Sequence, residues 1–294
     1  MMTNSNEQKA ICLALKEQGQ VGPKLFQQLL MTYGHPGNIY DHPAEDIASM
    51  VNINLERAEK IVGTRDLLDE THDTIGRLNA LKISVISYLD DNYPEYLRHI
   101  PDPPVAIYSR GDCDLLQRGG IAIVGTTAAD QEGIRAAVDF ARSFVEHGKT
   151  IISGLALGID SAGHLGALKN NGKTIAVLGC GHLNIYPEEN ESLAGLITDS
   201  GAVISEFDIH AKAIAGRLVS RNRLIAGLAD AVLIVQVGKK RRGELYAGQA
   251  AVDQGKPVFV YDPKDQYAAQ ELLNNLVIKI KSLEQIDEML SYIV

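Results

Sequence analysis

Six short runs of apolar, mostly β-branched residues mark the second half of the chain. They read IAIVG, TIISG, TIAVLG, AVISE, AVLIVQV and PVFVYD, and the segments between them are mostly of helical length. Continuous apolar strands that alternate with helices are typical of a parallel sheet covered on both faces. The pattern therefore predicts an α/β fold, a Rossmann-like open parallel sheet with helices on both faces, over residues 121–264.

The remainder of the chain divides into three parts. Residues 1–80 have helical spacing of apolar residues, and the run VGPKLFQQLL opens a helix at a Gly-Pro, as a helix-hairpin-helix (SAM-like) domain often does. Because a second hairpin glycine motif is missing, a helical packing or protein-contact domain is an equal expectation. Residues 81–120 are expected to form an extended connector, with the proline-rich PDPP segment, and the first elements of the core, and residues 265–294 a short helical and strand extension.

Composition narrows the class of protein. The chain of 294 residues is 45% apolar and 22% charged, and its three cysteines include no Cys-x-x-Cys pair. These values favour a globular protein of the reducing cytoplasm and argue against a zinc or other metal site. Neither a signal peptide nor a membrane-spanning run is expected.

Charge is unevenly distributed. The chain carries −9 overall, yet residues 210–256 hold nine Lys or Arg and only three Asp or Glu. A basic segment on an acidic chain predicts local contact with a polyanion, whereas a solvated surface loop is the alternative.

Ligands of open parallel sheets bind outside the carboxyl ends of the strands, so the residues that follow each strand are the candidate site. Glycines there let backbone approach an anion, and the helix that follows offers unpaired N–H groups. The spacing G-x-G-x-x-G is absent, so we expect no dinucleotide cofactor, and no other cofactor is indicated. After the first three strands the candidate phosphate-binding residues are Gly125, Thr126, Thr127, Ser153, Gly154, Gly158, Gly179 and Gly181.

Basic residues follow the fourth and fifth strands. Arg221 and Arg223 flank Asn222 beside a helix, and such a pair can form a forked donor set for phosphate oxygens. The loop after the fifth strand contributes a second basic group, although ordinary solvated side chains are the alternative for both. Its candidate residues are Lys239, Lys240, Arg241 and Gly243.

A catalytic set is not expected. Asp160 is placed to cap a helix, and His164 is expected to be a packed or surface histidine. Cys180 lies between glycines but has no partner base that the sequence reveals. The chain is therefore predicted to bind a ligand rather than to transform it.

Taken in order, these motifs resemble the DprA/Smf family of DNA-processing proteins. The most specific are SGLALGID and RNRLIAGL at their separation, and LDDNYPEYLRHIPDPPVAIYSRGD and TIAVLGCGHLNIYPEEN extend the resemblance over most of the chain. The resemblance implies a cytoplasmic protein that binds single-stranded DNA without sequence readout. It also implies a homodimer that loads the RecA recombinase during natural transformation.

Three positions depart from the family pattern. Thr127 stands where the family usually has an arginine, and Leu218-Val219 stands where it commonly has Phe-Pro. Glu244 occupies the place of a small hydroxyl residue, and an acid there is expected to weaken binding to a polyanion.

Two other functions stay open. A nucleotide-binding or phosphoribohydrolase-like enzyme on a related Rossmann-like fold would use an acidic residue after a glycine, as in Gly243-Glu244, although the Pro-Gly-Gly-x-Gly-Thr loop of such enzymes is missing. A protein–protein scaffold would use the helical N-terminal part as its contact surface.

Overall fold

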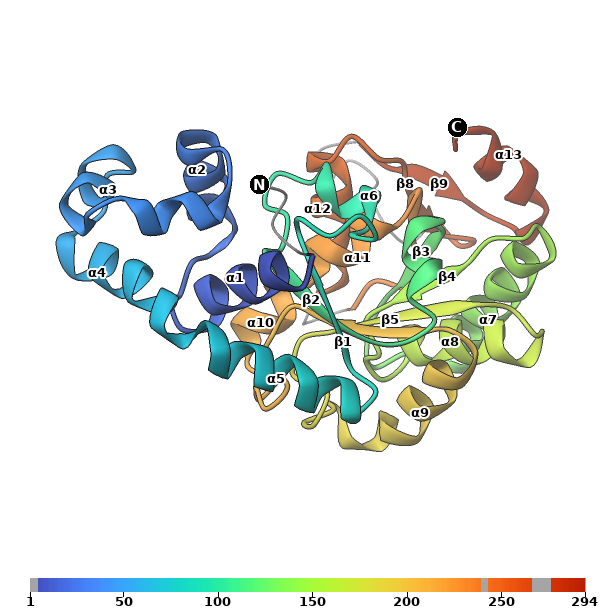
Figure 1. Ribbon diagram of the computed structural model, residues 1–294. Helices are drawn as coiled ribbons and strands as arrows, with labels where there is room; N and C mark the ends of the chain where they lie inside the picture. The colour runs from blue at the N-terminus through green and yellow to red at the C-terminus, as the bar shows by residue number, and fades with distance from the viewer. Residues whose placement is uncertain (1–4, 239–242, 266–275, 294) are drawn as a thin grey trace. The chain divides into compact units, whose positions relative to one another are not determined.

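A computed structural model describes residues 5–238, 243–265 and 276–293 (Figure 1). The chain forms two compact units, each held together by contacts among its own residues. The first unit comprises Met1–Tyr93 and Pro101–Ser109, and the second comprises Pro94–Ile100 and Arg110–Val294.

The first unit is mainly helical. Its buried side chains, among them Leu15, Phe26, Leu29 and Ile61, come from successive helices and form one apolar core. Two antiparallel strands follow the helices, with Ser84 opposite Ser109. The elements are α1 (Ser5–Glu17), α2 (Pro23–Tyr33), η1 (Pro36–Asp41), α3 (Ala44–Met50), α4 (Leu55–Gly63), η2 (Thr64–Leu67), α5 (Leu68–Ala80), β1 (Ser84–Ser87) and β2 (Ala106–Gly111).

The second unit is built on parallel strands. Its strand elements are β3 (Ile121–Val124), β4 (Ile151–Ser153), β5 (Thr174–Leu178), β6 (Ala202–Ser205), β7 (Ala231–Ile234), β8 (Val258–Tyr261) and β9 (Ile278–Ile280). Within the described residues these strands lie in the order β6-β5-β4-β3-β7-β8-β9, and every neighbouring pair is parallel. The chain moves outward from β3 to β6 and then returns to β7 on the other side of β3. Strand order therefore reverses at β3, which is where such sheets form a ligand crevice.

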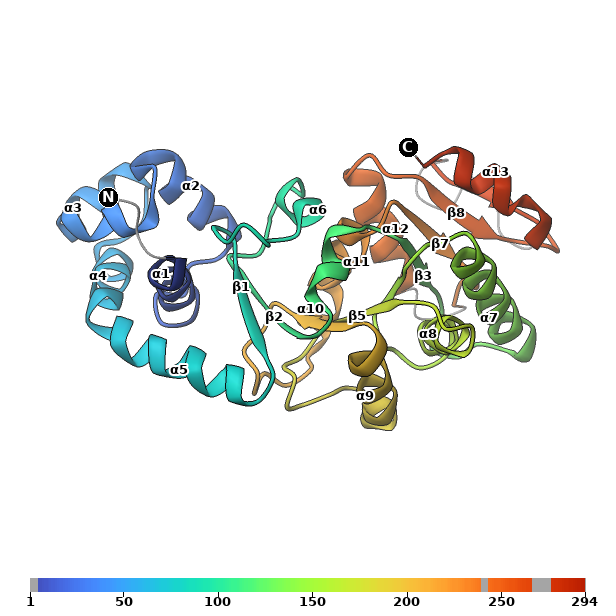
Figure 2. The ribbon, with the colours of Figure 1, turned by 45° about the vertical axis from the view of Figure 1, so that its right-hand side comes forward.

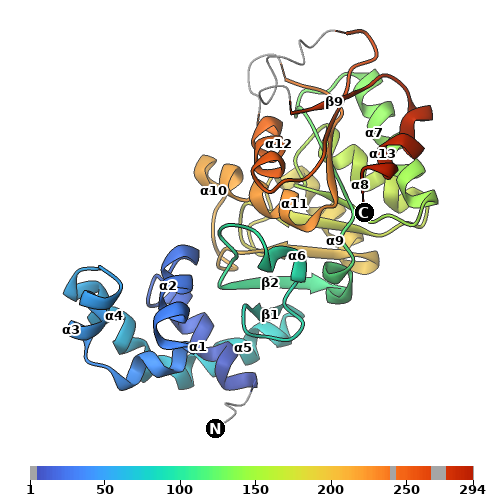
Figure 3. The same cartoon turned by 90° about the horizontal axis from the view of Figure 1, so that it is seen from above.

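Helices cover both faces of this sheet. Figure 3 shows α7, α8 and α13 on one side of the strands and α11 and α12 on the other. The helical elements of the unit are α6 (Glu95–Arg98), η3 (Cys113–Gln117), α7 (Gln131–Glu146), α8 (Ile159–Lys169), η4 (Glu188–Asn190), α9 (Glu191–Ser200), α10 (Ala215–Ser220), α11 (Asn222–Leu228), α12 (Glu244–Asp253), η7 (Leu283–Gln285) and α13 (Ile286–Ser291).

Strands β3 to β8 are mainly apolar because nearly all of their residues are buried. Ile121 and Ile123 of β3 pack with Phe140 and Phe144 of α7 in the larger core, which also includes Leu233. A second cluster joins β5 and β6 to α9. The predicted fold class, a Rossmann-like open parallel sheet preceded by a helical part, is confirmed.

The described ranges lack both a membrane-spanning helix and a metal-binding cluster. No helix there has the length and apolar character required to cross a bilayer. The same ranges contain no cluster of three or more His, Cys, Asp or Glu side chains able to hold a metal ion.

Candidate phosphate-binding site

The loop between β3 and α7 is fastened to the end of β7. The N–H of Thr126 donates to the carbonyl of Gln236 (2.9 Å), and the Gln236 side chain donates to the carboxylate of Asp130 (2.9 Å). Asp130 also caps α7 by accepting from the N–H of Gly133 (2.8 Å). These hydrogen bonds, that of Gly133 first, hold the pKa of Asp130 below its ordinary value. Thr127 is left exposed at the tip of the loop.

The loop between β4 and α8 folds around a buried carboxylate. Asp160 accepts from the N–H groups of Gly154 (3.1 Å) and Ala156 (3.4 Å) and is 5% exposed. Burial raises the pKa of Asp160, and the nearby Arg221 opposes that shift. The sequence placed Asp160 as a helix cap, but Gly158 occupies the N-cap position and Asp160 is the second residue of α8. Its carboxylate instead turns back to order the loop.

Arg221 lies inside the structure rather than on a surface. It is 5% exposed, and its Nη1 atom donates to the carbonyls of Gly154 (2.5 Å) and Val177. The guanidinium therefore joins the ends of β4 and β5 and offsets the charge of Asp160. Any phosphate-binding role of Arg221 stays a prediction, since both of these acceptors belong to the chain itself.

The two loops meet at Gly158, where the backbone adopts a φ of 77°. A Cβ at this position would lie 2.4 Å from the carbonyl oxygen of Thr126, so only glycine allows the approach. The N–H of Ile159 donates to the same oxygen (3.4 Å). In Figure 2 the helices that follow the loops, α7 and α8, lie side by side.

Several N–H groups of these loops have no acceptor among the described residues. They include those of Thr127 and Leu157, which are exposed, and that of Gly158, which is partly exposed. Each lies close to the N-terminus of α7 or α8, where the aligned peptide dipoles favour an anion. The arrangement can therefore donate to phosphate oxygens through backbone alone.

Other candidate residues lie against the chain's own backbone. The Ser153 hydroxyl is buried and donates to the carbonyl of Ile123 (2.6 Å). A Cβ at Gly179 would come within 3.0 Å of the Leu218 backbone, and one at Gly181 would come within 2.2 Å of the Asp208 carbonyl. In this structure the two glycines let the segment after β6 pack closely on the end of β5.

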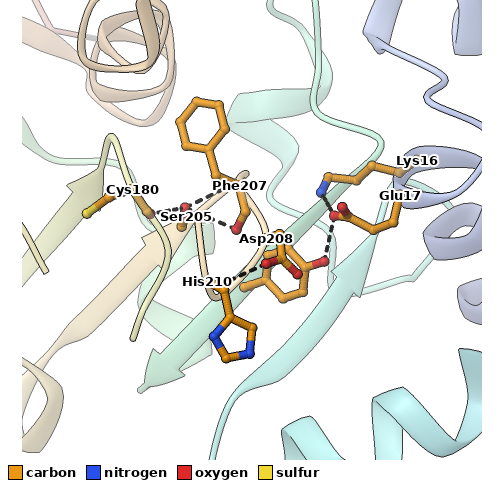
Figure 4. A network of polar contacts seen from close by, with 8 residues as sticks. Lys16, Glu17, Cys180, Ser205, Phe207, Asp208 and His210 are labelled. Carbon is orange, nitrogen blue, oxygen red and sulfur yellow. Dashed lines mark hydrogen bonds and ion pairs between the residues drawn. The ribbon is translucent and has the colours of Figure 1, made fainter. Parts of the chain in front are cut away.

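A hydrogen-bond network fixes that segment (Figure 4). The Ser205 hydroxyl donates to the carbonyl of Cys180 (2.7 Å) and accepts from the N–H of Phe207 (3.0 Å), and Asp208 accepts from the N–H of His210 (2.8 Å). The Cys180 thiol is buried, and burial raises its pKa. A raised pKa disfavours the thiolate that a nucleophile requires.

His164 is a packed residue rather than a surface one, which were the two alternatives expected from the sequence. It is fully buried, and its Nδ1 atom is 2.6 Å from the hydroxyl oxygen of Thr174, which itself donates to the carbonyl of Ile151. Burial, with the charge of Arg221 as the smaller cause, lowers the pKa of His164 to about 3.

The remaining candidates belong to α11 or to the segment that follows β7. Arg223 pairs with Glu206 (2.5 Å), and the side-chain amide of Asn222 donates to the carbonyl of Gly243 (3.4 Å). The Glu244 carboxylate is buried and accepts from the N–H of Gly238 (2.6 Å). Lys239, Lys240 and Arg241 lie outside the described residues.

The candidates Gly125 to Thr127, Gly154 and Gly158 thus lie in two loops that contact each other. Arg221 is buried against Gly154. Sequence reasoning missed two residues that support them. Asn190 donates to the carbonyl of Leu155 (2.8 Å), and Gln236 fastens the first loop. No local pattern indicates either role, because each partner lies far away in the sequence.

Comparison with known proteins finds relatives that match most of this chain. The family model of DNA recombination-mediator protein A matches residues 84–293. The protein Smf of Synechocystis sp. is 31% identical over 279 residues, which cover 92% of this chain and 70% of the relative.

Two solved structures are similar as well. The X-ray structure of DNA processing protein A from Streptococcus pneumoniae has a TM-score of 0.79 and 28% identity, and 98% of each chain is covered. The structure of DNA processing protein A from Helicobacter pylori, described for its unique single-stranded DNA binding mode, has a TM-score of 0.64 and 28% identity over 72% of this chain and 98% of that chain. The chain belongs to the DprA/Smf family, described as DNA recombination-mediator protein A.

Proposed function

We propose that this protein binds the backbone of single-stranded DNA at the loops that follow β3, β4 and β7. The observation that carries the proposal is the group of unpaired backbone N–H donors of Thr127, Leu157 and Gly158 at the point where strand order reverses. Backbone donors bind phosphate without reading bases, as a protein that accepts any single strand requires.

Two further observations support a polyanionic ligand. Residues 210–256 are locally basic on an acidic chain, and the similar Helicobacter pylori protein is described as binding single-stranded DNA. In this proposal Arg221 is a positioning residue. Its guanidinium donates to the Gly154 carbonyl, and its positive charge stabilises the Asp160 carboxylate that orders the β4–α8 loop.

The test is a titration of fluorescent oligo-dT by anisotropy at several salt concentrations. We expect binding at low salt that weakens as salt rises, with a slope of log K against log salt of about −0.7 for each phosphate neutralised. Absence of binding at low salt would contradict the proposal.

Substitutions of Glu244 distinguish single-stranded DNA binding from nucleotide hydrolysis. Replacement by Gln keeps an acceptor for the Gly238 N–H but removes a negative charge, whereas Glu244→Ser also frees that N–H. A DNA-binding site should gain affinity for oligo-dT in both variants. A phosphoribohydrolase would instead release a base from a nucleoside monophosphate, and Glu244→Gln would abolish that release.

We also propose, from membership of the family, that the protein acts as a homodimer and delivers single strands to the RecA recombinase. Sedimentation at micromolar concentration tests the dimer. Acceleration of RecA filament formation on oligo-dT coated with a single-strand-binding protein tests the delivery, and an unchanged filament lag would contradict it.

A further inference from the structure

A cavity lies at the opposite end of the same strands, at their amino ends. Its volume is about 420 Å³, and it is lined by the turns that immediately precede β3, β4 and β5. These strands are neighbours and parallel, so their amino ends lie at one edge of the sheet. The cavity is thus separate from the loops at the carboxyl ends.

Each of the three turns contributes a cation to this cavity. Arg118 precedes β3, Lys149 precedes β4 and Lys173 precedes β5, and His147 lies beside Lys149. The lining residues include no Asp or Glu, although the chain as a whole is acidic. Such a concentration of positive charge attracts anions.

Two of these cations have no partner within the described residues. The side chains of Arg118 and Lys173 are exposed and make neither a hydrogen bond nor an ion pair there. Lys149, by contrast, is 3.3 Å from a carboxylate oxygen of Asp230, and His147 is 3.3 Å from Asp287. A ligand could therefore engage Arg118 and Lys173 without breaking an existing contact.

The turns also hold their backbone in tight conformations. Gly119, Gly148 and Asn171 have φ values of 66°, 73° and 55°. At Gly172 a Cβ would lie 2.2 Å from the Val145 side chain, so this turn packs closely on the end of α7. These turns place the three cations in the lining of one cavity at the edge of the sheet.

We propose that this cavity is a second phosphate-binding site, held by Arg118 and Lys173, with Lys149 as a supporting charge. Arg118 suits two oxygens of one phosphate because its guanidinium is a planar fork. The phosphate comes from the backbone of a single strand that has already engaged the first site, and that part of the proposal rests on the proposed function. A free phosphate is the other source of the same chemistry.

The experiment compares two double variants. The cavity variant is Arg118→Ala/Lys173→Ala, and the control is Arg142→Ala/Lys169→Ala. The control removes the same charge from α7 and α8, outside the cavity. Inorganic phosphate is titrated first, while amide resonances of Gly119, Gly148 and Gly172 are followed by NMR. We expect shifts in the wild type and the control and none in the cavity variant.

The second arm uses oligo-dT of about 6 nucleotides, near the lower end of the usual range of single-strand site sizes, and of about 30 nucleotides, above that range. The cavity variant should bind the short oligomer as the control does. For the long oligomer its slope of log K against log salt should be shallower by about 1.4, the loss of two phosphate contacts.

The outcomes separate the two proposals. Phosphate shifts without any oligo-dT binding would support the cavity with free phosphate as its source and would contradict the proposed function. Phosphate shifts with equal long-oligomer slopes would support the cavity and overturn the nucleic-acid source. Absence of phosphate shifts, together with equal slopes, would overturn the second site while oligo-dT binding still supports the first.

Discussion

The Nη1 atom of Arg221 lies 2.5 Å from the carbonyl oxygen of Gly154, in a part of the molecule from which solvent is almost excluded. A Cβ at Gly154 would lie 2.2 Å from the same nitrogen, so the guanidinium occupies the space that a larger residue would need. Arg221 and the β4–α8 loop therefore form one structural unit, whose other charge is the buried Asp160.

Removal of Arg221 should destabilise the protein strongly. Arg221→Ala removes the cation that opposes the buried charge of Asp160, and removal of one partner from a buried charge pair costs about 3–5 kcal/mol. The free energy of unfolding from urea titration measures this loss. Arg142→Ala, at an exposed ion pair of α7, should change it by less than about 0.5 kcal/mol. If Asp160→Asn in the Arg221→Ala background restored nothing, the electrostatic cause would be wrong.

Gly158 should be less tolerant of alanine than Gly255. Both have positive φ, 77° and 70°, but a Cβ meets the Thr126 carbonyl only at Gly158, whereas the space around Gly255 is open. Gly255→Ala should cost about 1 kcal/mol of backbone strain. Gly158→Ala should cost more and should also weaken oligo-dT binding, because the two loops must separate. Equal unfolding free energies and equal affinities in the two variants would contradict this.

An arginine at position 127 should strengthen binding to single-stranded DNA. The Thr127 side chain is exposed at the tip of the first loop, so a longer cation there can contact phosphate without repacking. We expect about tenfold tighter oligo-dT binding, equivalent to about 1.4 kcal/mol, and a steeper salt dependence. Thr127→Gln controls for size, and Thr127→Glu should weaken binding. The same affinity in all three variants would place the DNA elsewhere.

His164 should contribute to the loss of folding stability at acidic pH. Its folded-state pKa of about 3 is below the ordinary value of 6.5, so between these values the unfolded chain binds a proton that the folded chain does not. Stability is therefore lost as pH falls from about 6.5, by about 1.4 kcal/mol for each pH unit from this group. His164→Asn, which cannot titrate, should show a shallower fall between about pH 6 and pH 4. The exposed His72→Asn serves as its control, and parallel curves for His164→Asn and wild type would contradict the assignment.

The sheet could be predicted from local pattern because burial on both faces requires continuous apolar strands. All six predicted runs are strands, from β3 at Ile121 to β8 at Tyr261, and the C-terminal extension adds β9. The loops after β3 and β4 could be located by the same reasoning, since strand ends follow from strand positions.

The internal partners of the site could not be predicted in this way. Arg221 donates to carbonyls 67 and 44 residues away, and Asn190 to one 35 residues away. Such contacts follow from the packing of distant segments, which residue type and spacing do not encode.

The most direct measurement is amide hydrogen exchange with and without oligo-dT. Binding through backbone donors should slow the exchange of Thr127, Leu157 and Gly158, while the amides of α5 in the first unit serve as an internal reference. Slower exchange in the loops after β3 and β4 is the result we expect. Saturated oligo-dT binding with unchanged exchange at these three amides would contradict the central claim.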